Sequence, residues 1–239
     1  MKRIIFIGDV HSTFLELKEL IKKVEYNSNT DRVILLGDLT DRGLFPTETI
    51  RYVRDMKFDC ILGNHDAKIL KWHRNKNPDK NYPDYYNKLS EDDISFIANM
   101  PTYIEFDDVI AIHAGMRPGI PLSRQGSDLM YLRYTDSNRK LISLRKISEL
   151  GIKATGARFW TEFGPFGKSI IYGHQVHSMT DVRIDKFDDG TAAYGIDLGC
   201  CFGGHLACII KYNDNSKPIE IVKVKAKQIY YQSNFVIKD

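Results

Sequence analysis

The stretch that decides the fold is Ile4-Ile5-Phe6-Ile7-Gly8-Asp9-Val10-His11, near the start of the 239-residue chain. Four apolar residues are followed at once by a glycine, a carboxylate and, two residues later, an imidazole. Four residues are far too few for a membrane span or for the core of a signal peptide. The run therefore predicts a buried first β-strand that ends in the polar residues Asp9 and His11.

The same arrangement, an apolar run that stops at a polar motif, recurs along the chain. The further runs are Val33–Leu36 before Gly37-Asp38, Cys60–Leu62 before Gly63-Asn64-His65, Val109–Ile112 before His113, and Ser169–Tyr172 before Gly173-His174. Each run has the length and the β-branched content of a strand. Polar side chains are thus predicted at the ends of five strands.

Helical patterns separate the first strands. One predicted helix has a single apolar face, formed by Phe14, Leu17, Ile21 and Val24. Pro46 is placed to open a second helix that runs through Met56, and Ser90 with Asp93 resembles a capping box for a third that ends near Met100. Strands alternating with helices indicate βαβ units, whose ligands bind beyond the carboxyl ends of the strands. The polar motifs all fall there.

The C-terminal third predicts a different pattern. Val182–Phe187 and Ala192–Ile196 flank Asp188-Asp189-Gly190 and read as a hairpin, and further strands are expected at Leu206–Tyr212 and Ile219–Val224. We expect a mixed sheet or two packed sheets. Since no repeat or linker interrupts the chain, we predict a single domain over residues 1–239.

Composition narrows the class of protein. The chain carries 34 basic and 31 acidic residues, for a formal net charge of +3, and no long basic block. We therefore expect no membrane association and no dedicated nucleic-acid surface. The four cysteines show no C-x-x-C spacing, which favours buried free thiols in a reducing cytoplasm.

The polar motifs form a set of oxygen and imidazole ligands without thiolates. Such a set suits Mn, Fe, Zn or Ni and argues against a structural zinc cage. We expect two divalent ions, Mn²⁺ first among them, that activate a water for attack on phosphorus. Asp9 and His11 are predicted to hold one ion, Asp38 to bridge, and a second group to hold the other: Asn64, His113 and His174.

Two motif residues that are not ligands suggest how a phosphate ester is handled. His65 follows a ligand and is expected to protonate the leaving oxygen, with Asp41 orienting it. Arg42 can direct two N–H donors to phosphate oxygens, a geometry that lysine does not reproduce.

These blocks resemble the signature motifs of the phosphoprotein phosphatase family, within the calcineurin-like metallophosphoesterases. They occur in the family's order: Gly8–His11, Gly37–Gly43, Gly63–Asp66, His113–Gly115 and Gly173-His174. His113–Gly119 with Asp128–Arg133, and Gly195–Gly199 with Phe202-Gly203-Gly204, are similar to compact bacterial and phage members. The resemblance implies an α/β fold of four layers (α/β/β/α), in which two packed mixed sheets are flanked by helices.

The resemblance also implies that Arg133 is a second phosphate-binding arginine. The alternative is that Arg133 forms the solvated edge of a helix face with Leu129 and Leu132. Ser12, Gln175 and Asp66 depart from the usual pattern, but none is an expected ligand. Asp66 is common in the branch that hydrolyses dinucleoside tetraphosphates.

The resemblance favours a phosphatase for phosphoserine or phosphothreonine in proteins, acting by direct attack of a metal-bridging water. The alternative is a hydrolase of diadenosine tetraphosphate or a similar nucleotide polyphosphate. A phosphodiesterase or nuclease and an inactive binding protein fit the motifs less well. For the nucleotide alternative, Trp72, Tyr82, Tyr85 and Tyr86 would bind adenine from a polar surface excursion over Lys71–Lys88; packing within a helix face is the simpler interpretation of these aromatics.

Overall fold

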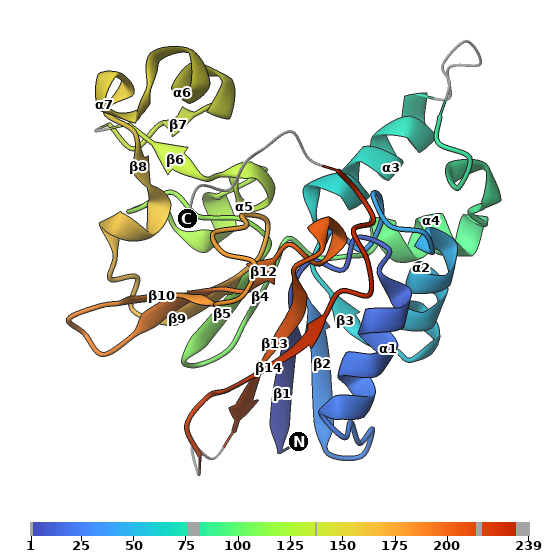
Figure 1. Cartoon of the computed structure of the whole chain (residues 1–239). Helices are drawn as coiled ribbons and strands as arrows, with labels where there is room; N and C mark the ends of the chain where they lie inside the picture. The colour runs from blue at the N-terminus through green and yellow to red at the C-terminus, as the bar shows by residue number, and fades with distance from the viewer. Residues whose placement is uncertain (1, 76–81, 137, 214–216, 233–239) are drawn as a thin grey trace.

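The computed structural model describes residues 2–75, 82–136, 138–213 and 217–232 (Figure 1). Within these residues the first sheet has six strands in the order β12-β13-β1-β2-β3, with β14 paired to β13. Its strands are β1 (Arg3–Ile7), β2 (Asp31–Leu35), β3 (Asp59–Cys60), β12 (Asp197–Leu198), β13 (His205–Tyr212) and β14 (Glu220–Lys225). Strands β1, β2 and β3 are parallel, whereas β13 runs antiparallel to β1. The sheet is therefore mixed, as predicted.

The second sheet has five strands in the order β10-β11-β9-β5-β4. These are β4 (Tyr103–Glu105), β5 (Val109–Ile112), β9 (Ser169–Tyr172), β10 (Arg183–Lys186) and β11 (Ala192–Gly195). Strands β5 and β9 pair in parallel, so their carboxyl ends lie at the same edge. The predicted hairpin is confirmed as β10 and β11.

Four helices cover the outer face of the first sheet (Figure 1): α1 (Phe14–Lys23), α2 (Pro46–Asp55), α3 (Asn64–Asn75) and α4 (Glu91–Ala98). Pro46 is the first residue of α2, as expected, and Ser90 with Asp93 forms the predicted capping box of α4. The apolar faces of these helices pack with Ile5, Ile7 and Val33 in one core cluster.

Alternate side chains of the central strands enter different layers, because successive strand residues point to opposite faces. In β1, Ile5 and Ile7 face the helices, whereas Ile4 and Phe6 face the second sheet. In β5, Val109 and Ala111 face the first sheet, whereas Ile110 and Ile112 pack outward. Both sheets are thus buried on two faces, which confirms the predicted packed sheets.

The fourth layer is built from short pieces. It comprises α5 (Asp128–Tyr131), a 3₁₀ turn over Trp160–Phe163, and a small three-stranded sheet of β6 (Tyr134–Thr135), β7 (Leu141–Ile142) and β8 (Arg158–Phe159). Between β7 and β8 lie α6 (Leu144–Leu150) and α7 (Ile152–Thr155), which have no buried residue. The four-layer prediction therefore holds, although the outer layer of the second sheet contains little helix.

The interpretation of Lys71–Lys88 as a polar surface excursion is wrong in part. Helix α3 continues to Asn75, and Trp72 is buried in the core beneath the helices. Tyr82 and Tyr86 pack around Trp72 with ring centroids 5.7 Å from it. Residues 76–81 of this stretch lie outside the described part. The aromatic cluster is therefore packing between helices, because Trp72 offers no free face to a ligand.

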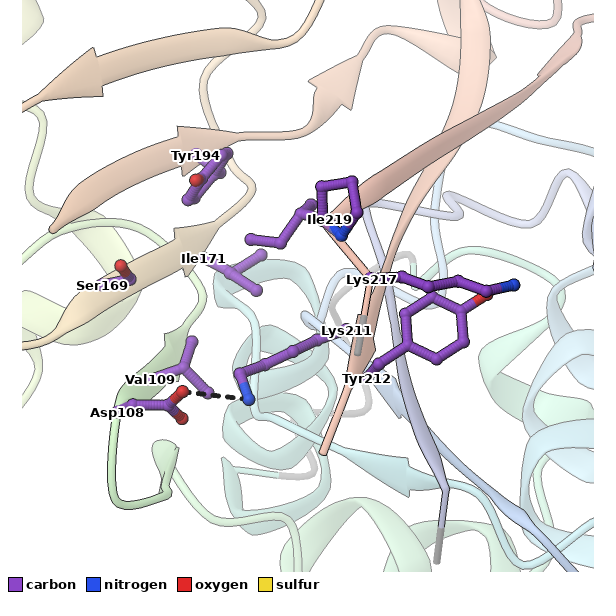
Figure 2. Close-up of a pocket in the computed structure, with 10 residues that line it drawn as sticks. Asp108, Val109, Ser169, Ile171, Tyr194, Lys211, Tyr212, Lys217 and Ile219 are labelled. Carbon is purple, nitrogen blue, oxygen red and sulfur yellow. Dashed lines mark ion pairs between the residues drawn. The ribbon is translucent and has the colours of Figure 1, made fainter. Parts of the chain in front are cut away.

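A cavity of about 340 Å³ opens between the two sheets, at the edge opposite the polar motifs (Figure 2). It is lined by the first residues of β5 and β9, Val109 and Ser169, and by Lys211, whose ammonium lies 3.0 Å from the Asp108 carboxylate. The polar motifs follow the other ends of the same strands. This cavity is therefore separate from them.

No helix in the described ranges is long and apolar enough to cross a membrane.

Candidate active site

The five predicted strand ends converge where the edges of the two sheets meet. Asp9 follows β1 and Asp38 follows β2, Asn64 and His65 open α3 just after β3, and His113 and His174 follow β5 and β9. Most of these side chains are buried, with relative exposures of 3% or less for Asp9, His11, Asp38 and His113. The structure thus brings all six predicted ligands to one region.

Two groups of side chains lie close enough together to hold a metal ion, and both include Asp38. One consists of His11, Asp38 and His65, and the other of Asp38, His113 and His174. The donor atoms within each group lie within 4.8 Å of one another. Asp38 directs Oδ2 to His11 Nε2 at 3.6 Å and Oδ1 to His113 Nε2 at 3.5 Å. A carboxylate placed between two ligand groups is the geometry of a bridging ligand.

Asn64 and Asp9 complete the surroundings of the two groups. His113 Nε2 lies 3.1 Å from the Asn64 side-chain oxygen and 3.1 Å from His174 Nδ1. Asp9 Oδ2 lies 4.0 Å from His11 Nε2, and both Asp9 oxygens accept the backbone N–H of His174 at 3.0 and 3.1 Å. Asp9 therefore adjoins both groups, although the group that contains His11 has His65, and not Asp9, as its third member.

Backbone carbonyls fix which nitrogen of two histidines faces the centre. His11 Nδ1 donates to the Thr40 carbonyl at 3.0 Å, and His113 Nδ1 donates to the Leu36 carbonyl at 2.7 Å. Nε2 of each ring is then the nitrogen that faces the centre, and it would offer its lone pair to a cation once it carries no proton. Such hydrogen bonds orient and strengthen histidine ligands in metal sites.

The centre brings several carboxylates together in the protein interior. Four carboxylates are buried around it: Asp9, Asp38, Asp66 and Asp197. Burial, with the neighbouring Asp197 carboxylate, raises the pKa of Asp9 well above its usual range. Although burial opposes the charged form of His113, Asp38 outweighs it and raises the pKa of His113 to about 10. Because buried charges require compensation, this donor set fits divalent cations.

Glycines allow the carboxylates to approach the backbone. A Cβ on Gly63 would collide with the Asp38 carboxylate, and one on Gly173 would collide with that of Asp9. Six non-glycine residues of the motifs also have a positive φ, between 45° and 75°: His11, Ser12, Asp38, Asp41, Arg42 and His174. Such conformations cost free energy and cluster at functional sites, where surrounding contacts hold them.

His65, Asp41 and Arg42 lie together beside the first group. His65 Nδ1 donates to Asp41 Oδ2 at 2.7 Å, which leaves Nε2 facing the centre. The His65 hydrogen bond, with the nearby Lys68 ammonium, lowers the pKa of Asp41. Arg42 donates to His11 Nε2 at 2.7 Å and to His65 Nε2 at 3.2 Å. Asp41 is therefore placed where it could orient His65.

Arg133 is not the edge of a helix face. Helix α5 ends at Tyr131, and the half-buried Arg133 donates from its terminal nitrogen to the His174 carbonyl at 3.2 Å. Its Nε is buried without a partner among the described residues. Burial lowers the pKa of Arg133, and the Asp197, Asp38 and Asp9 carboxylates oppose that effect. Arg133 is therefore a half-buried guanidinium near the carboxylates of the centre and not the solvated edge of a helix.

Two carboxylates at the centre were assigned no role from the sequence. Asp197 is buried among the ligands and accepts the Gly199 N–H at 3.0 Å, and burial raises its pKa. Asp66 accepts the N–H groups of Leu39 and Gly63, so it ties two strand ends together. The Gly195–Gly199 block could have pointed to Asp197. The position of Asp66 inside a ligand motif could likewise have indicated a supporting role.

The remaining histidines have structural partners, as expected. His73 lies 3.7 Å from the Glu91 carboxylate, and His205 Nδ1 donates to the Met179 carbonyl at 2.7 Å. His177 Nδ1 accepts from Arg183 at 3.3 Å. All four cysteines are buried and free. These residues therefore contribute to packing.

Comparison with known proteins agrees with this geometry. The model of the calcineurin-like phosphoesterase family matches residues 2–208. The chain belongs to this family. Members of this family have a dinuclear, metal-dependent centre. The chain is therefore a metal-dependent phosphoesterase.

Curated relatives in the family share a name. A Citrobacter koseri protein named symmetrical bis(5'-nucleosyl)-tetraphosphatase is 26% identical over an alignment 259 residues long, which covers 85% of this chain and 89% of that protein. A Vibrio parahaemolyticus protein of the same name is 34% identical over 118 residues. That shorter alignment covers 47% of this chain and 44% of the Vibrio protein, less than half of each.

Solved structures confirm the fold. A protein provisionally named a diadenosine tetraphosphatase superimposes with a TM-score of 0.76 at 21% identity, covering 94% of both chains. A Saccharomyces cerevisiae serine/threonine phosphatase similar to human PP5 gives a TM-score of 0.63 at 18% identity, covering 95% of this chain and 81% of the other.

If Asp38 bridges two ions, its replacement should disturb both. We expect Asp38→Asn to lower bound Mn²⁺ from about two per chain to well below one, whereas His11→Ala should retain about one. Metal analysis after equilibrium dialysis measures both stoichiometries. Asp59→Asn, at a partly exposed carboxylate paired with Arg32, serves as the control and should bind as the unaltered chain does. An Asp38→Asn protein that keeps its full metal content contradicts the bridging assignment.

Proposed function

We propose that the chain hydrolyses dinucleoside polyphosphates of the diadenosine tetraphosphate type. The observation that carries the substrate class is the alignment with the Citrobacter koseri tetraphosphatase over 85% of the chain. The sequence motifs alone favoured phosphoproteins as substrates, with nucleotide polyphosphates as the alternative. The names of the relatives support nucleotide polyphosphates better than phosphoproteins, so we now put nucleotide polyphosphates first.

The proposed site residues divide into three roles. Two divalent cations would be held by Asp9, His11, Asp38, Asn64, His113 and His174, where they would acidify a water and neutralise phosphoryl oxygens. Arg42 and Arg133 would bind the non-bridging oxygens of the phosphate under attack. His65, oriented by Asp41, would protonate the leaving phosphate oxygen.

The contacts of Arg42 suggest how the phosphate enters. In the structure its donors point to the Nε2 atoms of His11 and His65. An incoming anion offers stronger acceptors than neutral imidazoles, because hydrogen bonds between charged groups are roughly twice as strong. A phosphate would therefore draw the guanidinium away and leave both Nε2 atoms free for their own roles.

Phosphoproteins stay a second candidate because the motif blocks resemble protein phosphatases. Their case is weaker, since the yeast phosphatase shares the fold at 18% identity and no substrate follows from that. The single-domain assignment for residues 1–239 and Mn²⁺ as the metal remain part of this proposal.

A parallel assay tests the substrate class. With Mn²⁺ added, we expect diadenosine tetraphosphate to give a higher kcat/KM than a phosphoserine peptide or an aryl phosphodiester. The Asp38→Asn protein controls for contaminating activity and should hydrolyse none of them. Preference for the phosphopeptide would restore the protein-phosphatase candidate and defeat the proposal.

The two arginines should matter for turnover rather than for metal binding. Arg42→Ala or Arg133→Ala is expected to lower kcat about 10–1000-fold, as for the loss of one donor to a developing oxyanion, with metal content unchanged. Lysine should rescue poorly because it lacks the planar fork of donors. Arg145→Ala, at an exposed helix position, is the control. Normal turnover in Arg133→Ala would remove Arg133 from the site.

A further inference from the structure

The chain after β14 is tied to the active-site edge of the first sheet. This C-terminal strap, residues 226–231, rises along that sheet in red in Figure 1. The N–H groups of Tyr230 and Tyr231 donate to the Cys201 carbonyl at 3.0 and 2.9 Å. The Tyr230 hydroxyl donates at 2.7 Å to Glu16, a carboxylate buried in α1. The strap lies beyond residues 2–208, so the family match does not account for it.

The strap places an aromatic ring beside the phosphate-binding Arg42. The Arg42 guanidinium carbon lies 5.0 Å from the ring centroid of Phe202 and 6.0 Å from that of Tyr231. The two rings are themselves 6.2 Å apart at an interplanar angle of 64°. Phe202 is half-buried, whereas Tyr231 is 49% exposed. Tyr231 therefore presents ring surface to solvent next to the Arg42 guanidinium.

The packing of the other aromatics near α3 leaves this corner as the better candidate for a planar ligand. Trp72 is 9% exposed, Tyr82 and Tyr86 pack against it and against each other, and the partly buried Tyr85 packs against the same core cluster. A base could reach those rings only by displacing core contacts. Nothing of that kind is required at Tyr231.

We propose that Tyr231, supported by Phe202, stacks on the nucleobase of a nucleotide whose phosphate binds Arg42. This inference rests on the proposed function. In a nucleotide only the ribose separates the base from the first phosphate. A ring that stacks on the base therefore has to lie close to the arginine that binds this phosphate, as Tyr231 lies close to Arg42. Stacking tolerates any base because each has a π face, so adenine and guanine nucleotides should bind comparably.

A purely structural role for Tyr231 makes a different prediction. A ring that only props Arg42 would affect the binding of every phosphate ligand equally. A ring that stacks on the base would affect nucleotides more than sugar phosphates. The ratio of the two affinities therefore separates the roles.

Calorimetric titration of the Mn²⁺-loaded protein with AMP and with ribose 5-phosphate measures this ratio. We expect AMP to bind about 5- to 150-fold more tightly than ribose 5-phosphate, the range for one stacked base. Tyr231→Ala should bring the ratio close to one, and Tyr231→Phe and Tyr231→Trp should restore it. Ile229→Ala, an exposed position on the same strap, controls for disturbance of the strap and should keep the ratio.

Three results would overturn the inference: equal affinities in the unaltered protein, no measurable AMP binding, or an unchanged ratio in a folded Tyr231→Ala protein. The outcome is independent of the assay on diadenosine tetraphosphate. Hydrolysis of that substrate without a preference for AMP would refute only the stacking role. A preference for AMP without that hydrolysis would refute only the proposed function.

Discussion

The buried carboxylate of Asp38 is the constraint on which the rest of the site depends. It lies between two sets of histidine nitrogens, and three further carboxylates are buried around it. Negative charge at this density is stable in a protein interior only next to cations. The glycines against the carboxylates, the left-handed backbone of the motifs and the carbonyls that orient His11 and His113 all serve to hold this arrangement.

The fold supplies that constraint through its parallel strands. Strands β1, β2 and β3 end at one edge of the first sheet, and β5 and β9 end at the facing edge of the second. Side chains that are distant in sequence, such as Asp9 and His174, are thereby brought into hydrogen-bonding contact. Ligands placed at strand ends are held by the sheets, so the loops between them are free to carry substrate contacts.

The strands and the polar residues at their ends could largely be predicted, because each apolar run indicates a strand and each motif directly follows such a run. Local signals also gave α2 and α4, since Pro46 and the Ser90–Asp93 box act on their own helices. Other features depend on contacts between distant segments. Nothing near Trp72 in sequence reveals that Tyr82 and Tyr86 bury it, and nothing near Arg42 reveals Tyr231, which lies 189 positions further along the chain. Arg133 was left open for the same reason.

The most direct test of the account is a crystal structure of the Mn²⁺-loaded protein with anomalous scattering recorded for manganese. The account predicts two anomalous peaks about 4 Å apart, with the Asp38 carboxylate between them and Arg42 turned away from His11 Nε2 toward any bound phosphate. A single peak, or two peaks that do not share Asp38, would contradict it.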